Sequence, residues 1–90
     1  AEEAEQKGLI NKCLPQGELE NYLLEKAKKI SSKSRTTLKI GKKAFYHQIE
    51  MPLVEAYEYA SQVMVENMMD QDAKEGIEAF LEKRSPNWKE

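Results

Sequence analysis

One cysteine and one histidine are the residues of this sequence whose types suit nucleophilic catalysis, and they are Cys13 and His47. A thiolate nucleophile would need both side chains within hydrogen-bonding reach and a third group to orient the imidazole. The two residues are far apart in sequence, and their spacing does not argue for such a pair. A buried thiol and a half-exposed imidazole are the simpler interpretation. One cysteine and one histidine also cannot supply the four ligands of a zinc site.

Carboxylates are the next candidates, because two of them can work as an acid–base pair. The glutamates considered are Glu55, Glu58, Glu66 and Glu75. Each falls in a segment with helical spacing beside other acidic residues, so a solvated helix face explains them better. The four glycines are too scattered to form a phosphate-binding loop. Residue chemistry alone therefore predicts a module without a catalytic constellation.

Charge is divided sharply along the chain. Residues 26–49 contain lysines and arginine but no acidic residue, whereas residues 50–82 contain nine acidic residues and only Lys74 as a base. The basic segment could bind a phosphate-rich or acidic partner. Alternatively, the two segments attract each other within the fold and otherwise face water. The second interpretation is favoured, because the chain is acidic overall, with 14 basic and 16 acidic residues.

The elements that would position these residues are mainly helical. We expect one domain with four to five helices and one short strand. A first helix should end at Gly8, which can adopt the left-handed conformation of a helix stop. The apolar run Leu9–Leu14, closed by Pro15, has the length of one strand. From residue 18 to residue 49, apolar residues recur every three or four positions, which predicts two helices interrupted by the serine-rich stretch 31–34.

Two further helices complete the expected fold. Pro52 suits a first helical turn, and residues 53–69 continue without proline or glycine. The last helix could be capped by Asp70, or by Asp72 in a capping box with Glu75. Pro86 is expected to end it. Its expected apolar face consists of Ala73, Ile77, Phe80, Leu81 and the stem of Arg84.

The apolar content is modest for the surface it must cover. The hydrophobic fraction is 40%, and a domain of this size buries only about 60 to 65% of its unfolded surface. We therefore expect marginal stability or reliance on a partner. No apolar run is long enough for a membrane span or a signal peptide. One cysteine fits a reducing compartment, so a soluble intracellular protein is expected, and a start at Ala1 within a helical pattern suggests a piece of a longer chain.

The carboxyl-terminal stretch carries a family resemblance. Residues 72–88, DAKEGIEAFLEKRSPNW, resemble the C-terminal signature of the enoyl-CoA hydratase/isomerase, or crotonase, superfamily. AEEA at 1–4 and GLINK at 8–12 look like the family segment in which a short helix leads into a core strand. GKKAFYHQ at 41–48 and SQVMVEN at 61–67 are most similar to the mitochondrial enoyl-CoA hydratase domain-containing proteins. The resemblance covers essentially the whole chain.

The resemblance implies the helical C-terminal region of an α/β spiral fold. Residues 1–15 would be the end of the crotonase core, and residues 16–90 a helical region for oligomerisation and CoA covering. The family's catalytic glutamates and thioester-binding amides would precede Ala1, so no catalytic residue is assigned and the chain alone is not expected to be an enzyme. The parent would be a lyase or isomerase acting on a coenzyme A thioester, with no metal or covalent cofactor.

The resemblance also implies partners and a compartment. The implied partners are further copies of the chain in a trimer, the N-terminal crotonase core and acyl-CoA, and neither nucleic acid nor a membrane is an expected partner. The implied setting is fatty-acid metabolism in the mitochondrion. The competing hypothesis is a non-enzymatic helical interaction module that uses segment 26–49 to bind a phosphate-rich or acidic partner.

Two residues are implied as binding residues. The family's final helix presents a phenylalanine and, three residues later, a lysine to the CoA nucleotide, and the matching positions are Phe80 and Lys83. Within a helix this spacing places both on one face, where the ring could stack on adenine and the ammonium could meet a phosphate. Phe80 also has a core interpretation because it lies on the apolar stripe, whereas Lys83 has none.

Overall fold

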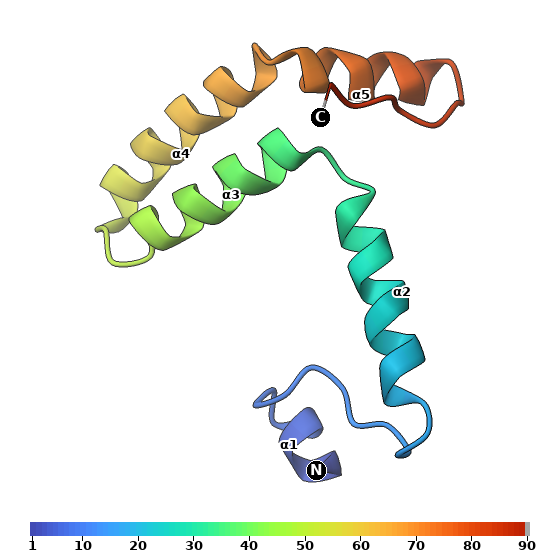
Figure 1. Ribbon diagram of the computed structural model, residues 1–90. Coiled ribbons are helices and arrows are strands. Elements are labelled where there is room, and N and C mark those ends of the chain that lie inside the picture. Colours follow the sequence, from blue (N-terminus) through green and yellow to red (C-terminus); the bar gives the residue numbers. More distant parts are fainter. Residues whose placement is uncertain (90) are drawn as a thin grey trace. The chain divides into compact units, whose positions relative to one another are not determined.

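The computed structural model describes residues 1–89, which are mainly helical as predicted (Figure 1). The helices are α1 (Glu2–Gln6), α2 (Leu19–Ser31), α3 (Arg35–Gln48), α4 (Leu53–Met68) and α5 (Gln71–Leu81). The chain forms two compact units, residues 1–30 and residues 31 onward. Among the described helices, none combines the length and the apolar character needed to cross a membrane.

In the first unit, α1 ends where the sequence predicts. Gly8 adopts a positive φ of 72°. Its amide donates to the Glu5 carbonyl at 3.0 Å, and the Leu9 amide donates to the Ala4 carbonyl at 2.8 Å. These two bonds form a Schellman motif, in which a left-handed residue satisfies the last helical carbonyls.

The predicted strand at residues 9–14 is wrong. The amides of Leu9 and Ile10 both donate to the Ala4 carbonyl, and the Cys13 amide donates to Glu5 Oε2 at 2.8 Å. A strand needs a neighbouring strand to take these bonds, and residues 1–89 contain none. The run turns back along α1 instead. The predicted boundary between residues 15 and 16, which separates a crotonase core from a helical region, stays a prediction.

The helix that follows, α2, contains no buried residue. Leu23 and Ile30 belong to the predicted apolar face, and their side chains are 54% and 57% exposed. The periodicity therefore predicted the helix correctly. The partner that the apolar face requires is not supplied by this unit.

In the second unit, α3 and α4 form an antiparallel hairpin (Figure 1). Thr37 Oγ1, near the start of α3, donates to Asn67 Oδ1 near the end of α4 at 3.3 Å. At the other end of the hairpin, the rings of His47 and Tyr59 lie 4.6 Å apart. The predicted starts are also confirmed, since Ser34 caps α3 by accepting from the Thr37 amide and Pro52 precedes α4.

The start of α5 decides between the two predicted caps. Asp70 is the cap, because its Oδ1 accepts the Asp72 amide at 2.9 Å. Asp72 is instead buried, with 2% of its surface exposed. The helix ends at Leu81, well before Pro86. The predicted stop at Pro86 is wrong because the chain leaves the helix in a left-handed turn at Lys83.

Candidate ligand-binding and assembly surface

An apolar cleft lies in the second unit between α3, the end of α4 and α5. Its volume is about 580 Å³, within the range of small-molecule sites. Leu38, Met68, Ile77 and Phe80 contribute apolar walls, and Trp88 from the chain terminus also lines it. The cleft can therefore take an apolar or aromatic group.

Phe80 lines this cleft but is not packed into a core. Its surface is 82% exposed, and its neighbour Leu81 is 72% exposed. Ala79, its other neighbour on α5, is the one hydrophobic residue among residues 1–89 that is buried. The predicted core role of Phe80 is therefore absent from the described chain, and its aromatic ring is available for contact.

Lys83 lies outside α5, in the turn that ends the helix. Its φ is 55°, its amide donates to the Phe80 carbonyl at 3.2 Å, and the Arg84 amide donates to the Ala79 carbonyl at 3.0 Å. This is a second Schellman motif, with lysine at the position where glycine is usual. The expected helical spacing of Phe80 and Lys83 is thus corrected, because the backbone is no longer helical at residue 83.

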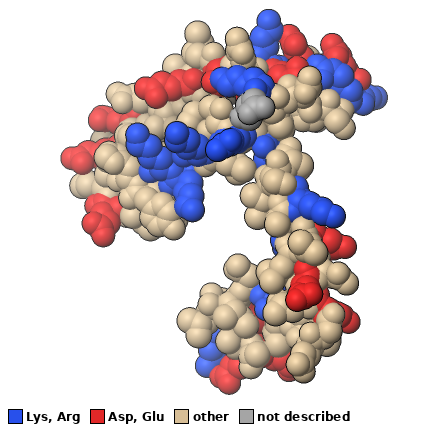
Figure 2. Space-filling view, in the orientation of Figure 1, with Lys and Arg blue, Asp and Glu red and all other residues tan. Residues whose placement is uncertain are grey.

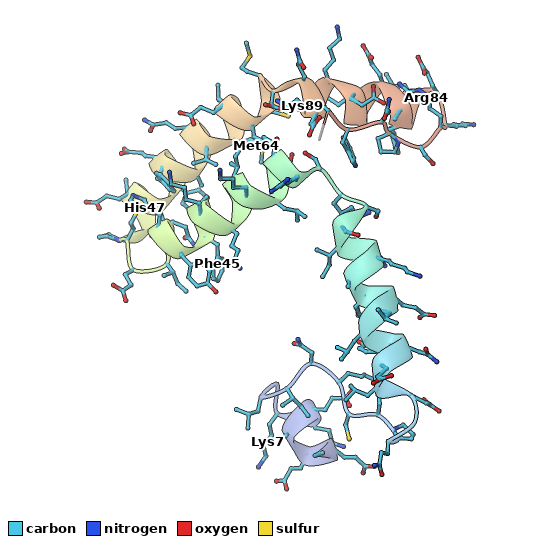
Figure 3. All side chains as sticks on the ribbon, in the orientation of Figure 1. Lys7, Phe45, His47, Met64, Arg84 and Lys89 are labelled. Atoms are coloured by element: carbon cyan, nitrogen blue, oxygen red, sulfur yellow. The ribbon has the colours of Figure 1, made fainter. Side chains whose placement is uncertain are left out.

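After this turn the chain runs back along α5, and we call residues 82–89 the C-terminal return. The Arg84 side chain lies beside the end of α5 (Figure 3). It forms a bidentate ion pair with Glu75, at 2.5 and 3.2 Å, and a second pair with Glu82 at 2.5 Å. The Asn87 amide donates to Glu75 Oε1 at 2.8 Å. The Arg84 hydrogen bonds, followed by the Asn87 amide, lower the pKa of Glu75 to about 2. Both carboxylate pairs raise the pKa of Arg84.

The last residues of the return contact the start of the unit. Trp88 lies against Gly76, where an added Cβ would be 3.3 Å from the ring, and its Nε1 donates to the Ser32 carbonyl at 2.8 Å. Lys89 Nζ pairs with Asp70 at 2.7 Å. That hydrogen bond, followed by the Asp72 amide, lowers the pKa of Asp70.

Asp72 joins these segments from its buried position. Its Oδ2 accepts from Ser34 Oγ at 2.5 Å, and its Oδ1 accepts from the Lys89 amide at 3.0 Å. The start of α3, the first turn of α5 and the C-terminal return therefore meet on one carboxylate. The sequence does not indicate this role, because the spacing of Asp72 and Glu75 predicts a helix cap instead. The only signal for it was its place in the 72–88 motif.

Most of the basic segment 26–49 that lies in this unit belongs to α3, where its charged side chains form an exposed face. Its charged residues are Arg35, Lys39, Lys42 and Lys43. Figure 2 shows basic side chains gathered on one side of the α3–α4 hairpin and acidic ones along its edge. Within residues 1–89 no ion pair joins α3 to α4. The contacts between the two helices include the His47–Tyr59 ring contact and the Thr37–Asn67 hydrogen bond, so the expected attraction does not take the form of paired charges.

The other residues considered for catalysis are Cys13, His47 and the glutamates. Cys13 is half-buried in the first unit, and the His47 ring packs on Tyr59 in the second. Of the glutamates considered for acid–base chemistry, Glu75 is fully engaged by the C-terminal return. The residues described contain no cluster of three or more histidine, cysteine, aspartate or glutamate side chains suited to a metal ion.

Comparison with known proteins identifies the family. A sequence model described as enoyl-CoA hydratase/isomerase matches residues 1–90. The chain belongs to the enoyl-CoA hydratase/isomerase family. It is 50% identical over 88 residues to the mitochondrial enoyl-CoA hydratase domain-containing protein 3 of Mus musculus, a match that covers 98% of this chain and 29% of the mouse protein. The Homo sapiens protein of the same name is 44% identical over 88 residues.

Solved structures agree with this assignment to the crotonase family. The crystal structure of human enoyl coenzyme A hydratase domain-containing protein 3 superimposes with a TM-score of 0.92 at 44% identity, covering 98% of this chain and 35% of that one. An enoyl-CoA hydratase of Mycobacterium smegmatis gives the same TM-score at 41% identity over 98% of this chain and 34% of that one. The resemblance and the mainly helical crotonase fold class are confirmed. The chain spans about a third of the length of these relatives.

Proposed function

We propose that the chain is the helical C-terminal region of a longer crotonase-family protein. In this role it supports trimer assembly and helps to hold acyl-CoA, while the catalytic groups lie in the preceding part. The observation that carries the proposal is the exposed apolar surface of α5, where Phe80 is 82% exposed beside an apolar cleft. A helix face of this kind requires either a ligand or another protein surface.

Assembly is supported by the amount of apolar surface left open. On α4, Met64 and Val65 are 60% and 63% exposed, and on α5 Leu81 is 72% exposed. Exposed apolar area of this extent is unfavourable in water, at about 25 cal/mol for each Å². Further copies of the chain and the crotonase core, which residues 1–15 would complete, are the proposed partners.

Acyl-CoA binding is proposed for Phe80 and Lys83. An exposed aromatic ring can stack on adenine, a contact worth about 1 to 3 kcal/mol. An exposed lysine ammonium can pair with a phosphate as a point charge. Both residues lie at the end of α5, one on the cleft wall and one in the turn that follows.

The parent protein would act on a coenzyme A thioester as a lyase or isomerase, in mitochondrial fatty-acid metabolism. The relatives named mitochondrial support the compartment. No metal or covalent cofactor is proposed. Two backbone amides would hold the thioester oxygen and two glutamates would handle water and proton in a hydratase, and these groups are expected in the preceding core.

The test is CoA titration of the longer protein by calorimetry, together with steady-state kinetics if it is active. Lys83→Ala should weaken binding by roughly 1 kcal/mol, the scale of one exposed charge-assisted contact. Since the contact is to the nucleotide, KM should rise while kcat stays nearly constant. The control is Lys74→Ala, which removes a lysine that pairs with Glu78 on α5 at 3.8 Å. An unchanged KM for Lys83→Ala would remove the proposed role.

The interaction-module hypothesis gives a different result in the same assay. Binding to heparin that weakens with salt, with no response to CoA, would support it. In that case Lys39→Ala and Lys42→Ala on α3 should reduce heparin binding. The family membership favours the CoA proposal instead.

A further inference from the structure

Lys83 occupies a backbone conformation that is unusual for its residue type. Among residues 1–89 it is the one non-glycine residue with a positive φ. A side chain makes this conformation less favourable, because Cβ approaches the following carbonyl oxygen. Such strain persists only where surrounding contacts over-determine it, and it is enriched at functional positions.

The turn itself does not require a lysine. Gly8 ends α1 with the same two amide-to-carbonyl bonds and a φ of 72°. Glycine satisfies this geometry without a steric cost. The geometry of the turn therefore does not account for a lysine at residue 83.

The contacts that over-determine the turn come from its immediate neighbour. Arg84 places two guanidinium nitrogens on the two oxygens of Glu75, a residue of α5 nine positions earlier in the chain. The same carboxylate accepts the Asn87 amide at 2.8 Å. A planar guanidinium on a carboxylate fixes both distance and orientation, which a single contact would not do.

We propose that Glu75 and Arg84 are positioning residues for Lys83: their bidentate ion pair holds the left-handed turn that presents the Lys83 ammonium to the phosphates of coenzyme A. This inference rests on the proposed function of Lys83. The cost of placing a lysine in this conformation is then offset by the ion pair and the return that it holds.

The experiment measures the dissociation constant for CoA in the longer protein by calorimetry. The variants are Lys83→Ala, Glu75→Gln and the double variant. Each single change should weaken CoA binding about fivefold, the loss of one charge-assisted contact. The double variant should be no weaker than Lys83→Ala, because Glu75 acts through Lys83. Both single variants should also reduce the salt dependence of binding, since one phosphate contact is lost.

Controls separate positioning from general destabilisation. Glu78→Gln alters another α5 carboxylate, whose partner Lys74 lies at 3.8 Å, and should leave CoA binding unchanged. Arg84→Lys keeps the charge but removes the bidentate geometry, so it should also weaken CoA binding. It replaces Glu75→Gln as the test if Glu75→Gln fails to fold. Lys83→Gly should raise the melting temperature and weaken CoA binding.

The outcomes distinguish the two proposals. If Lys83→Ala leaves CoA binding unchanged, the proposed function of Lys83 and this inference both fail. If Lys83→Ala weakens binding but folded Glu75→Gln and Arg84→Lys bind like wild type, only the inference is overturned. Effects of Lys83→Ala and Glu75→Gln that multiply in the double variant would also overturn it, because they would be independent.

Discussion

The chain turns back after α1 and again after α5 with the same local arrangement. After α1, a Schellman turn at Gly8 sends the chain back along the helix. Glu5 then accepts Lys12 Nζ and the Cys13 amide, both at 2.8 Å. The Lys12 hydrogen bond, followed by that of Cys13, lowers the pKa of Glu5. A helix carboxylate thus holds the returning chain through one cation and one backbone amide.

After α5 the arrangement is repeated, with Lys83 in the turn and Glu75 as the carboxylate. Here the cation is an arginine, and its bidentate pair lowers the pKa of Glu75 to about 2. The C-terminal return also continues to Trp88 and Lys89, which bind the start of the unit and the buried Asp72. The comparison indicates that a segment running back along its helix contributes to the tertiary fold only when its last residues contact buried groups.

The largest effect should come from Asp72→Ala. This change leaves Ser34 Oγ and the Lys89 amide without their acceptor in a site that is 2% exposed. We expect the free energy of unfolding to fall by about 2 to 4 kcal/mol, measured by urea denaturation. Glu5→Ala, which removes the carboxylate that holds the return in the first unit, should cost less because it uncovers no buried group. A larger loss for Glu5→Ala would contradict the comparison.

Trp88→Ala should have the next largest effect, because it removes the ring from Gly76 and the donor from the Ser32 carbonyl. A loss of about 2 kcal/mol is expected in the same denaturation assay. Trp88→Phe is the matched control, since it keeps a ring but loses the N–H, and it should cost about 1 kcal/mol. Equal losses for the two variants would mean that the hydrogen bond alone matters.

Substitutions at the two left-handed residues should change the free energy of unfolding in opposite directions. Gly8→Ala places a side chain at a φ of 72° and should destabilise by about 1 kcal/mol. Lys83→Gly relieves the same conflict at 55° and should stabilise by less than about 1 kcal/mol, because glycine also gains freedom in the unfolded chain. Melting temperatures read by circular dichroism test both. A lower melting temperature for Lys83→Gly would show that the turn is not strained.

The smallest effect concerns pH. Because the pKa of Glu75 is lowered to about 2 from 4.5, its ion pair contributes stability above about pH 4.5, and this contribution is lost as pH falls toward 2. Wild type should therefore lose stability between pH 4.5 and pH 2 more steeply than Glu75→Gln, measured by urea midpoints across that range. Matching slopes for the two proteins would mean that the pair contributes nothing to folding.

The sequence by itself determined what depends on near neighbours. Helix positions follow from apolar spacing over three or four residues, and the starts at Ser34 and Pro52 follow from side-chain and backbone chemistry within one turn. The stop at Gly8 is equally local, because only a left-handed residue is needed. The family could be inferred from the 72–88 motif because that stretch is specific in its residue order.

Only the tertiary structure decided the features that depend on distant partners. Asp70 and Asp72 both have a cap's spacing, and the choice between them depends on Ser34 and Lys89, which come from opposite ends of the unit. The run 9–14 has the composition of a strand, but a strand exists only where a second strand accepts its hydrogen bonds. Lys83 continues a helical spacing, yet Arg84 and Glu75 support a turn instead. Each of these choices depends on a hydrogen-bond partner outside the segment whose pattern made the prediction.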